Sequence, residues 1–194
     1  TTGANNVAVG VSALANNTTA NDNVAIGDDA LIVNTTGTGN TAVGKNALQT
    51  NSTGIENVGI GFNALSANTG SETVAIGHEA LSTMTTAVRN TAVGHEALTA
   101  NTTGYNNTAI GYVAGKGMTE GYQNTLVGDR AGTAITTGDN NTAVGQHALK
   151  TATTQNRNTA VGMDALTLAT NDDCTAVGAF SLAANSTGAD NTAV

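Results

Sequence analysis

The sequence lacks proline and tryptophan, and it has few aromatic or charged residues. Its 194 residues include three Tyr and two Phe, and only 10% of them are charged. So few large rings are typical of a thin core, which has no room for bulky side chains. A single cysteine, Cys174, excludes an intrachain disulfide framework.

Basic residues are scarce as well. Six Lys and Arg stand against 14 Asp and Glu, which gives a formal net charge of −8. Scattered basic side chains on an acidic chain do not form the basic surface that binds nucleic acid or anionic membranes. The chain also has no apolar run long enough to span a bilayer and no signal-peptide pattern at Thr1. We therefore expect no nucleic-acid partner and no insertion into a membrane.

What the chain does contain is a repeat. The stretch Asn-Thr-Ala-Val-Gly-Lys-Asn-Ala-Leu at residues 40–48 returns, lightly edited, from one end to the other. If its asparagine is column 1 and its glycine column 5, successive column 5 glycines are 17 residues apart, except for two steps of 16. These glycines are Gly10, Gly27, Gly44, Gly61, Gly77, Gly94, Gly111, Gly128, Gly145, Gly162 and Gly178. A fixed period predicts a single array of about eleven repeats over residues 1–194. Because the chain starts and stops within a repeat, we expect it to be a fragment of a longer polypeptide.

The columns indicate the fold. The structural repeat residues are Asn40, Ala42, Val43, Gly44, Ala47 and Leu48, and each stands for a column that varies little. Glycines and Thr-rich connectors in every repeat argue against helices. We predict an all-β parallel β-solenoid (β-roll), with one strand at columns 1–5, a second near columns 7–10 and a turn at columns 12–17. Both 16-residue repeats lose their residue in the turn, where deletions are tolerated.

The side chains on the two sides of the first strand differ in size. Columns 2 and 4 point one way and columns 1, 3 and 5 the other. Column 4 is always Val or Ile, and we expect it to lie inside the coil with the column 9 leucine. Column 3 is nearly always Ala, and a strand that is apolar on both faces is covered on both. We expect another copy of the chain to cover column 3, in a homotrimer.

No motif indicates catalysis. The sequence shows no catalytic set and no phosphate loop, so we expect no enzyme, no cofactor and no metal. The column 1 asparagines are either a surface array for a ligand or a ladder that bonds along the axis. His78-Glu79 and His95-Glu96 share columns in successive repeats, which is compatible with a zinc site or with a solvated face.

One region departs from the repeat. Column 9 is Gly115 and Gly132 in two successive repeats. All three tyrosines and two unusual column 12 residues lie in this region: Tyr105, Tyr112, Tyr122, Met118 and Ile135. These five residues are a candidate irregular patch, either a ligand site or kink, or a local repacking in which Met118 and Ile135 refill the volume lost with leucine.

The strand motif Asn-Thr-Ala-Val-Gly-x-x-Ala-Leu resembles the head repeats of YadA-type trimeric autotransporter adhesins and the repeats of phage tail fibres and bacterial surface fibres. The adhesin motif matches Asn23 to Gly27, although its period is typically shorter and it lacks the column 9 leucine. The resemblance implies a left-handed β-roll assembled as a homotrimer, and it implies no catalytic residues in the repeats.

Two functions remain open. The first is a non-catalytic structural or adhesive fibre segment, extracellular, on a cell surface or on a virion, that gives length, stiffness and multivalent display to a host-surface glycan or receptor. The second is a solenoid that binds an ordered lattice such as ice or a crystalline polysaccharide. Column 2 threonines alternate with valine and share the direction of column 4, which we expect to be buried. This direction argues against a threonine-based lattice surface.

Overall fold

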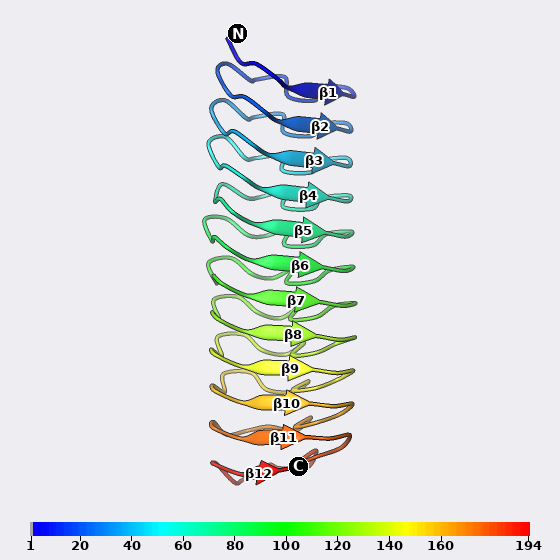
Figure 1. Cartoon of the computed structure of the whole chain (residues 1–194), viewed down its shortest axis with the longest axis vertical. Helices are drawn as coiled ribbons and strands as arrows, with labels where there is room; N and C mark the ends of the chain where they lie inside the picture. The colour runs from blue at the N-terminus through cyan, green and yellow to red at the C-terminus, as the bar shows by residue number, and fades with distance from the viewer. Residues whose placement is uncertain (1) are drawn as a thin grey trace.

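The chain folds into one stack of coils (Figure 1). The structure, a computed structural model, describes residues 2–194. Each coil contributes one short strand to a twelve-stranded sheet in which every strand lies beside its neighbours in sequence. The strands are β1 (Val7–Val9), β2 (Val24–Ile26), β3 (Thr41–Val43), β4 (Val58–Ile60), β5 (Val74–Ile76), β6 (Thr91–Val93), β7 (Thr108–Ile110), β8 (Thr125–Val127), β9 (Thr142–Val144), β10 (Thr159–Val161), β11 (Thr175–Val177) and β12 (Thr192–Ala193).

All strand pairs are parallel and equivalent columns pair with each other. Thr91 lies opposite Thr108, and Thr159 lies opposite Thr175 across one of the shorter repeats. The prediction of an all-β parallel solenoid with one coil per repeat is confirmed. Residues 2–194 contain no helix that is long and apolar enough to cross a membrane.

The prediction of a second strand at columns 7–10 is wrong. Columns 6 to 11 form consecutive turns, in which the backbone N–H groups of Ala97, Thr99 and Asn101 donate to the carbonyls three residues earlier. The backbone has positive φ at Glu96 (53°) and Leu98 (51°), and the same two columns have positive φ in every repeat. This conformation is incompatible with a strand. The coils still stack here, because Leu98 donates its N–H to the carbonyl of Ala114 in the next coil at 3.0 Å.

The predicted orientation of the strand is also wrong. From β2 to β11 the column 3 residue is buried within a single chain, and Ala92 and Ala109 have no exposed surface. Column 4 points outward, so that Ile110 is 41% exposed. Column 3 therefore cannot meet another copy. The column 9 leucines are buried, as expected.

The width of the coil explains this orientation. A Cβ atom built on Gly59, the one glycine in column 3, would lie 3.2 Å from the Leu48 side chain and 3.2 Å from the Ala64 carbonyl oxygen. An alanine just fits between these columns, and a branched side chain does not. Because valine and isoleucine have no space inside, they occupy the outer side of the strand.

The six structural repeat residues are likewise divided between the inside of the coil and its outer side. Asn40, Ala42, Ala47 and Leu48 are completely buried, Val43 lies on the outer side, and Gly44 has φ of 133°. A Cβ on Gly44 would lie 2.5 Å from the carbonyl oxygen of Gly61 in the next coil. Column 5 is glycine because the coils approach one another too closely for any other residue.

The column 1 asparagines form an internal ladder. Asn107 accepts the backbone N–H of Asn124 from the next coil at 2.9 Å. Its amide group donates to the carbonyl of Gly121 at 2.7 Å. Asn23 to Asn158 in this column are at most 1% exposed, so the ladder is structural and no surface array exists. Each rung satisfies backbone groups that burial would otherwise leave unpaired.

The two sides of the strand should respond differently to charge. We expect Ala109→Arg to lower the free energy of unfolding by at least ~3 kcal/mol, because the coil has no space for the side chain and would bury its charge. Ile110→Arg, one residue later and pointing outward, should keep a β-type circular dichroism spectrum. Denaturant unfolding compares the two variants, and equal loss of structure in both would contradict the orientation described here.

Candidate functional site

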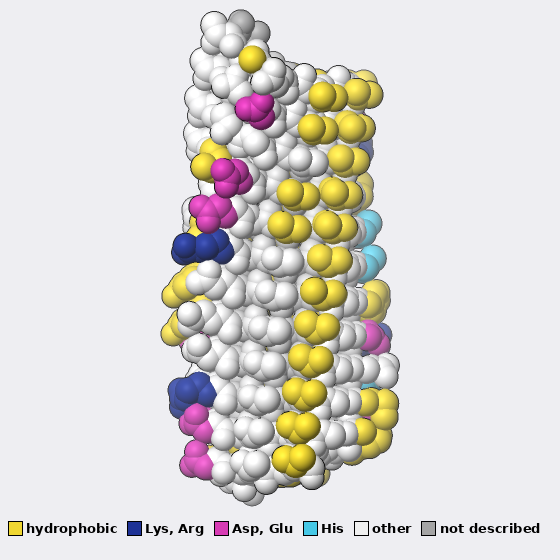
Figure 2. Space-filling view, in the orientation of Figure 1, with side chains coloured by type: hydrophobic (Ala, Val, Ile, Leu, Met, Phe, Trp, Pro, Cys, Tyr) yellow, Lys and Arg dark blue, Asp and Glu magenta, His cyan; other side chains and the backbone are white. Residues whose placement is uncertain are grey.

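The outer side of the strands forms a regular surface that runs along the whole stack of coils. It consists of the column 2 and column 4 side chains of β1 to β12, and we call it the β face. Column 4 supplies Val or Ile at all twelve levels, and Val9 (57% exposed) and Ile26 (39% exposed) are examples. Figure 2 shows these side chains as a continuous hydrophobic row along the rod. A contiguous apolar surface of this kind marks a contact site in soluble proteins.

The β face is uncharged and has two zones. Within residues 2–194, no charged residue lies in columns 2 to 4. In β1 to β5, column 2 is valine except for Thr41, and we call this part the valine zone. In β6 to β12 it is threonine at every level, which we call the threonine zone. The change is visible in Figure 2, where two hydrophobic rows near the N-terminal end become one.

The threonine hydroxyls of the β face are free. In column 13, at the connectors, Thr35, Thr102 and Thr136 donate their hydroxyls to backbone carbonyls of the next coil at 3.1 Å. Within the described chain, no column 2 threonine hydroxyl makes such a bond. The threonine zone therefore carries a row of unused hydroxyl groups beside a row of methyl groups, repeated at the strand spacing of about 4.8 Å.

A stack of rings lines one edge of the β face. It comprises Phe62, His78, His95 and Tyr112, all in column 6, and we call it the ring ladder. Ring centroids are 5.3, 4.9 and 5.4 Å apart along the stack. Arg130 continues it, with its guanidinium carbon 5.4 Å from the Tyr112 centroid. This ladder was not predicted from the sequence, although the rings recur in column 6 of successive repeats.

Within the described chain, no ion pair joins His78 or His95 to the glutamate that follows it in the sequence. Glu96 instead binds Lys116 of the next coil, and this hydrogen bond lowers the pKa of the Glu96 carboxyl group. The ring faces of His78 and His95 are stacked on neighbouring rings. Within residues 2–194, no group of three or more His, Cys, Asp or Glu side chains is arranged to hold a metal ion.

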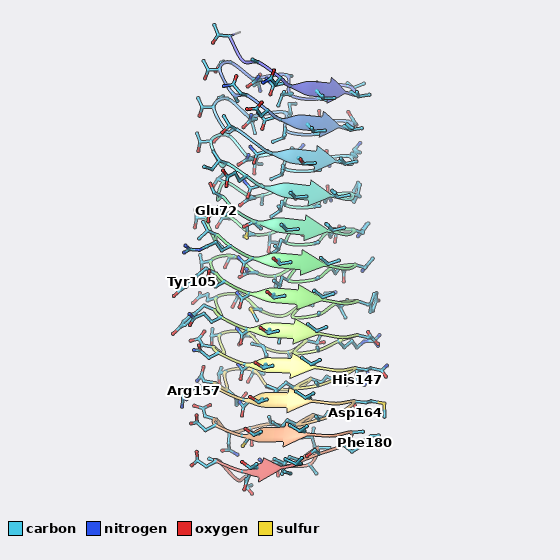
Figure 3. The ribbon with its side chains drawn as sticks, viewed as in Figure 1. Glu72, Tyr105, His147, Arg157, Asp164 and Phe180 are labelled. Atoms are coloured by element: carbon cyan, nitrogen blue, oxygen red, sulfur yellow. The ribbon has the colours of Figure 1, made fainter. Side chains whose placement is uncertain are left out.

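The candidate patch around the tyrosines is not one surface. Tyr105 and Tyr122 stack at a centroid distance of 5.2 Å on the connector edge, which Figure 3 places opposite the edge of His147, Asp164 and Phe180. A hydrogen bond with Asp139 raises the pKa of the Tyr122 hydroxyl. Tyr112 belongs to the ring ladder. The structure brings two of the three tyrosines together and leaves the third elsewhere.

The other members of the patch lie in the core. Met118 and Ile135 have no exposed surface, and neither has Leu126, the one large residue of column 3. Leu126 fits because column 9 is glycine on both sides of it: a Cβ on Gly115 or Gly132 would lie 2.7 Å from its methyl groups. The irregular region is therefore a local repacking that conserves volume, which was one of the two open interpretations.

The described residues form no deep binding cavity. No pocket is found in residues 2–194. Cys174 replaces an asparagine of the internal ladder and is buried, where its backbone N–H donates to Asn158 at 3.0 Å. Ion pairs such as Arg157 with Asp173 lie on the exposed connector edge (Figure 3). The β face is thus the candidate functional site.

The repacked region allows a compensating pair of substitutions. Leu126→Ala alone should cost about 2–5 kcal/mol of unfolding free energy, because it leaves a cavity in the core. Adding Gly115→Leu should recover most of this loss, since Leu81 occupies the same column beside Met84 in an earlier coil. Gly115→Leu without the first change should destabilise through overlap with Leu126. Thermal unfolding of the three variants measures the coupling, and simple additivity would contradict the account of repacking.

No family model matches this chain, and no curated protein and no solved structure was found to be similar to it.

Proposed function

We propose that this chain is a non-catalytic structural segment of an extracellular or virion fibre. The observation that carries the proposal is the β face, an uncharged apolar surface that repeats at every coil from β1 to β12. A soluble protein gains by covering such a surface, and a second copy of the chain offers a matching one. The absence of a pocket in the described residues also favours a structural role over a catalytic one.

The stack of coils has the length and the bonding that a spacer needs. Twelve strands at a spacing of roughly 4.8 Å make a rod about 53 Å long. Each interior strand bonds to a neighbour on both sides, and the Asn ladder ties coil to coil. Such a rod resists bending, because every coil must lose the same set of bonds before it can separate from the next.

We further propose that copies associate side by side through the β face as a homotrimer of left-handed coils. The resemblance to trimeric fibre repeats supports this stoichiometry and handedness. An assembled fibre displays each surface feature many times, so that weak contacts with a host-surface glycan or receptor add up through effective concentration. The acidic balance of the chain keeps such a fibre away from polyanions.

The assembly is tested by charge on the β face. The wild-type chain should sediment as a trimer, and Ile60→Asp with Val144→Asp should leave a folded monomer, because aspartate would be buried between copies. Thr53→Asp with Thr137→Asp, on the connectors that lead into β4 and β9, should keep the mass of the trimer. A wild-type chain that is monomeric at all concentrations in sedimentation equilibrium would contradict the proposal.

A lattice-binding function is the second candidate. The expectation that columns 2 and 4 are buried argued against it, and their outward orientation removes that objection. Free hydroxyls and methyls in two straight rows, without charge, suit contact with an ordered array of water molecules. This candidate predicts that the chain slows ice recrystallisation, that Thr142→Lys abolishes the effect and that Thr154→Lys retains it. Ice growth unaffected by the wild-type chain would exclude this function.

A further inference from the structure

A pair of tyrosines on the connector edge presents aromatic surface to solvent. Tyr105 and Tyr122 occupy column 16 of successive coils, and their rings are parallel within 3° at a centroid distance of 5.2 Å. This distance exceeds the ~3.5–4.0 Å at which carbon atoms touch, so neither ring covers the face of the other completely. Tyr105 is 40% exposed and Tyr122 is partly buried. Figure 2 shows hydrophobic side chains on this edge between two groups of basic side chains.

The carboxylate of Asp139 in the next coil holds the pair in place. It accepts the backbone N–H of Tyr122 at 2.9 Å and a hydrogen bond from the Tyr122 hydroxyl. The ring of Tyr122 is thus fixed by Asp139, and the ring of Tyr105 stacks on it. A ring that is already fixed loses little conformational entropy when a ligand binds to it.

Uncharged amide side chains accompany the tyrosines. Column 17, the position directly before each column 1, is charged at every level from Glu56 to Asp190 except at three successive levels, which are Asn106, Gln123 and Asn140. The backbone has a positive φ at all three, so their side chains leave it in the same direction. Within residues 2–194, these side chains make no hydrogen bond. Each amide therefore offers free donors and a free acceptor beside the rings.

We propose that the Tyr105–Tyr122 pair and the three amides bind a neutral glycan. This deepens the proposed function, on which it rests, by naming the class of the surface ligand and its site. A pyranose ring has C–H groups on its faces and hydroxyl groups around its edge. The tyrosine rings contact the C–H groups, and the amides exchange hydrogen bonds with the hydroxyls. The carboxylate of Asp139 and the net charge of −8 disfavour an acidic sugar.

The position of the pair suits a fibre. Tyr105 lies at the edge of the stack (Figure 3), and column 16 belongs to the connectors, so copies that meet through the β face leave the pair uncovered. No pocket is found in residues 2–194, and a contact without a pocket is weak. Each copy in an assembled fibre carries the same site, so that several weak contacts act together.

Binding of defined sugars tests the site. Cellotetraose, maltotetraose and chitotetraose are the probes, and saturation-transfer NMR measures their binding at millimolar concentration. We expect the wild-type chain to bind at least one of them. Tyr105→Ala with Tyr122→Ala should weaken this binding at least about tenfold, because both ring contacts are lost. Gln123→Ala should weaken it about threefold through one lost hydrogen bond. Tyr112→Ala, at the third tyrosine, is the matched control and should bind as the wild type does.

Tyrosine emission gives a second measurement at the site itself. The chain has three tyrosines and no tryptophan, so Tyr112→Phe leaves the pair as its only tyrosines. The emission of this variant should change on addition of the sugar and saturate over the same concentration range as the NMR signal. If the double alanine variant does not fold, as judged by circular dichroism, the emission and Gln123→Ala decide the question.

The site and the assembly fail in different ways. A wild-type chain that binds none of the three probes would overturn the site, and so would binding that survives the loss of both tyrosines. Sedimentation of the same samples reports on the assembly. A trimer that binds no probe would keep the assembly and lose the site, whereas a monomer whose binding depends on the pair would lose the assembly and keep the site.

Discussion

The narrowness of the coil interior is the constraint on which the rest of the structure depends. Each level encloses one side chain from column 3, one from column 8 and one from column 9. Alanine, alanine and leucine fill this space, and the contacts at Gly59 leave no room for a branched residue in column 3. Where Leu126 enlarges column 3, the column 9 residues on both sides of it are glycine. Volume is conserved across neighbouring coils, as close packing requires.

The same constraint creates the apolar surface. Valine and isoleucine suit a strand, but only the outer side of this strand has space for them. Within each strand the chain therefore buries the small alanine and places the larger valine or isoleucine on the outer side, which reverses the usual relation between side-chain size and burial. A surface that results from the internal geometry of every coil extends as far as the coils do. The area of the β face therefore grows with the number of repeats.

The period, the strand position and the burial of Leu48 could be predicted from the sequence, because identity in a column reports a shared environment. The alternation of side chains along a strand defines two faces but does not tell which face lies inside the coil. The larger residue of the strand, the valine or isoleucine of column 4, was wrongly expected to lie inside. The turns at columns 6 to 11 were missed because Glu96 and Leu98 rarely adopt positive φ. Asn46 and Asp29 lie in the same column as Glu96. They were the residues that indicated a positive φ in this column, since Asn and Asp favour this conformation.

Side-chain contacts between coils were harder to foresee. The ring ladder needs Phe62, His78, His95 and Tyr112 to share a rotamer as well as a column, and the rotamer is set by neighbours in space. The prediction of one patch around the tyrosines was wrong for a related reason. Tyr105 and Tyr112 are close in the sequence, but Tyr105 stacks on Tyr122 and Tyr112 stacks on His95.

A perfect repeat would make every alignment of two rods equivalent, apart from the length of their overlap. Departures from the repeat are thus the features that distinguish one level of the rod from another. The internal departures, such as Leu126 and its glycines, are hidden in the core and cannot be read by another chain. Those on the β face, above all the change from Val74 to Thr91, lie on the outer side of the strands. The inward columns therefore set the fold, and the outward columns set how the levels of the rod differ on its surface.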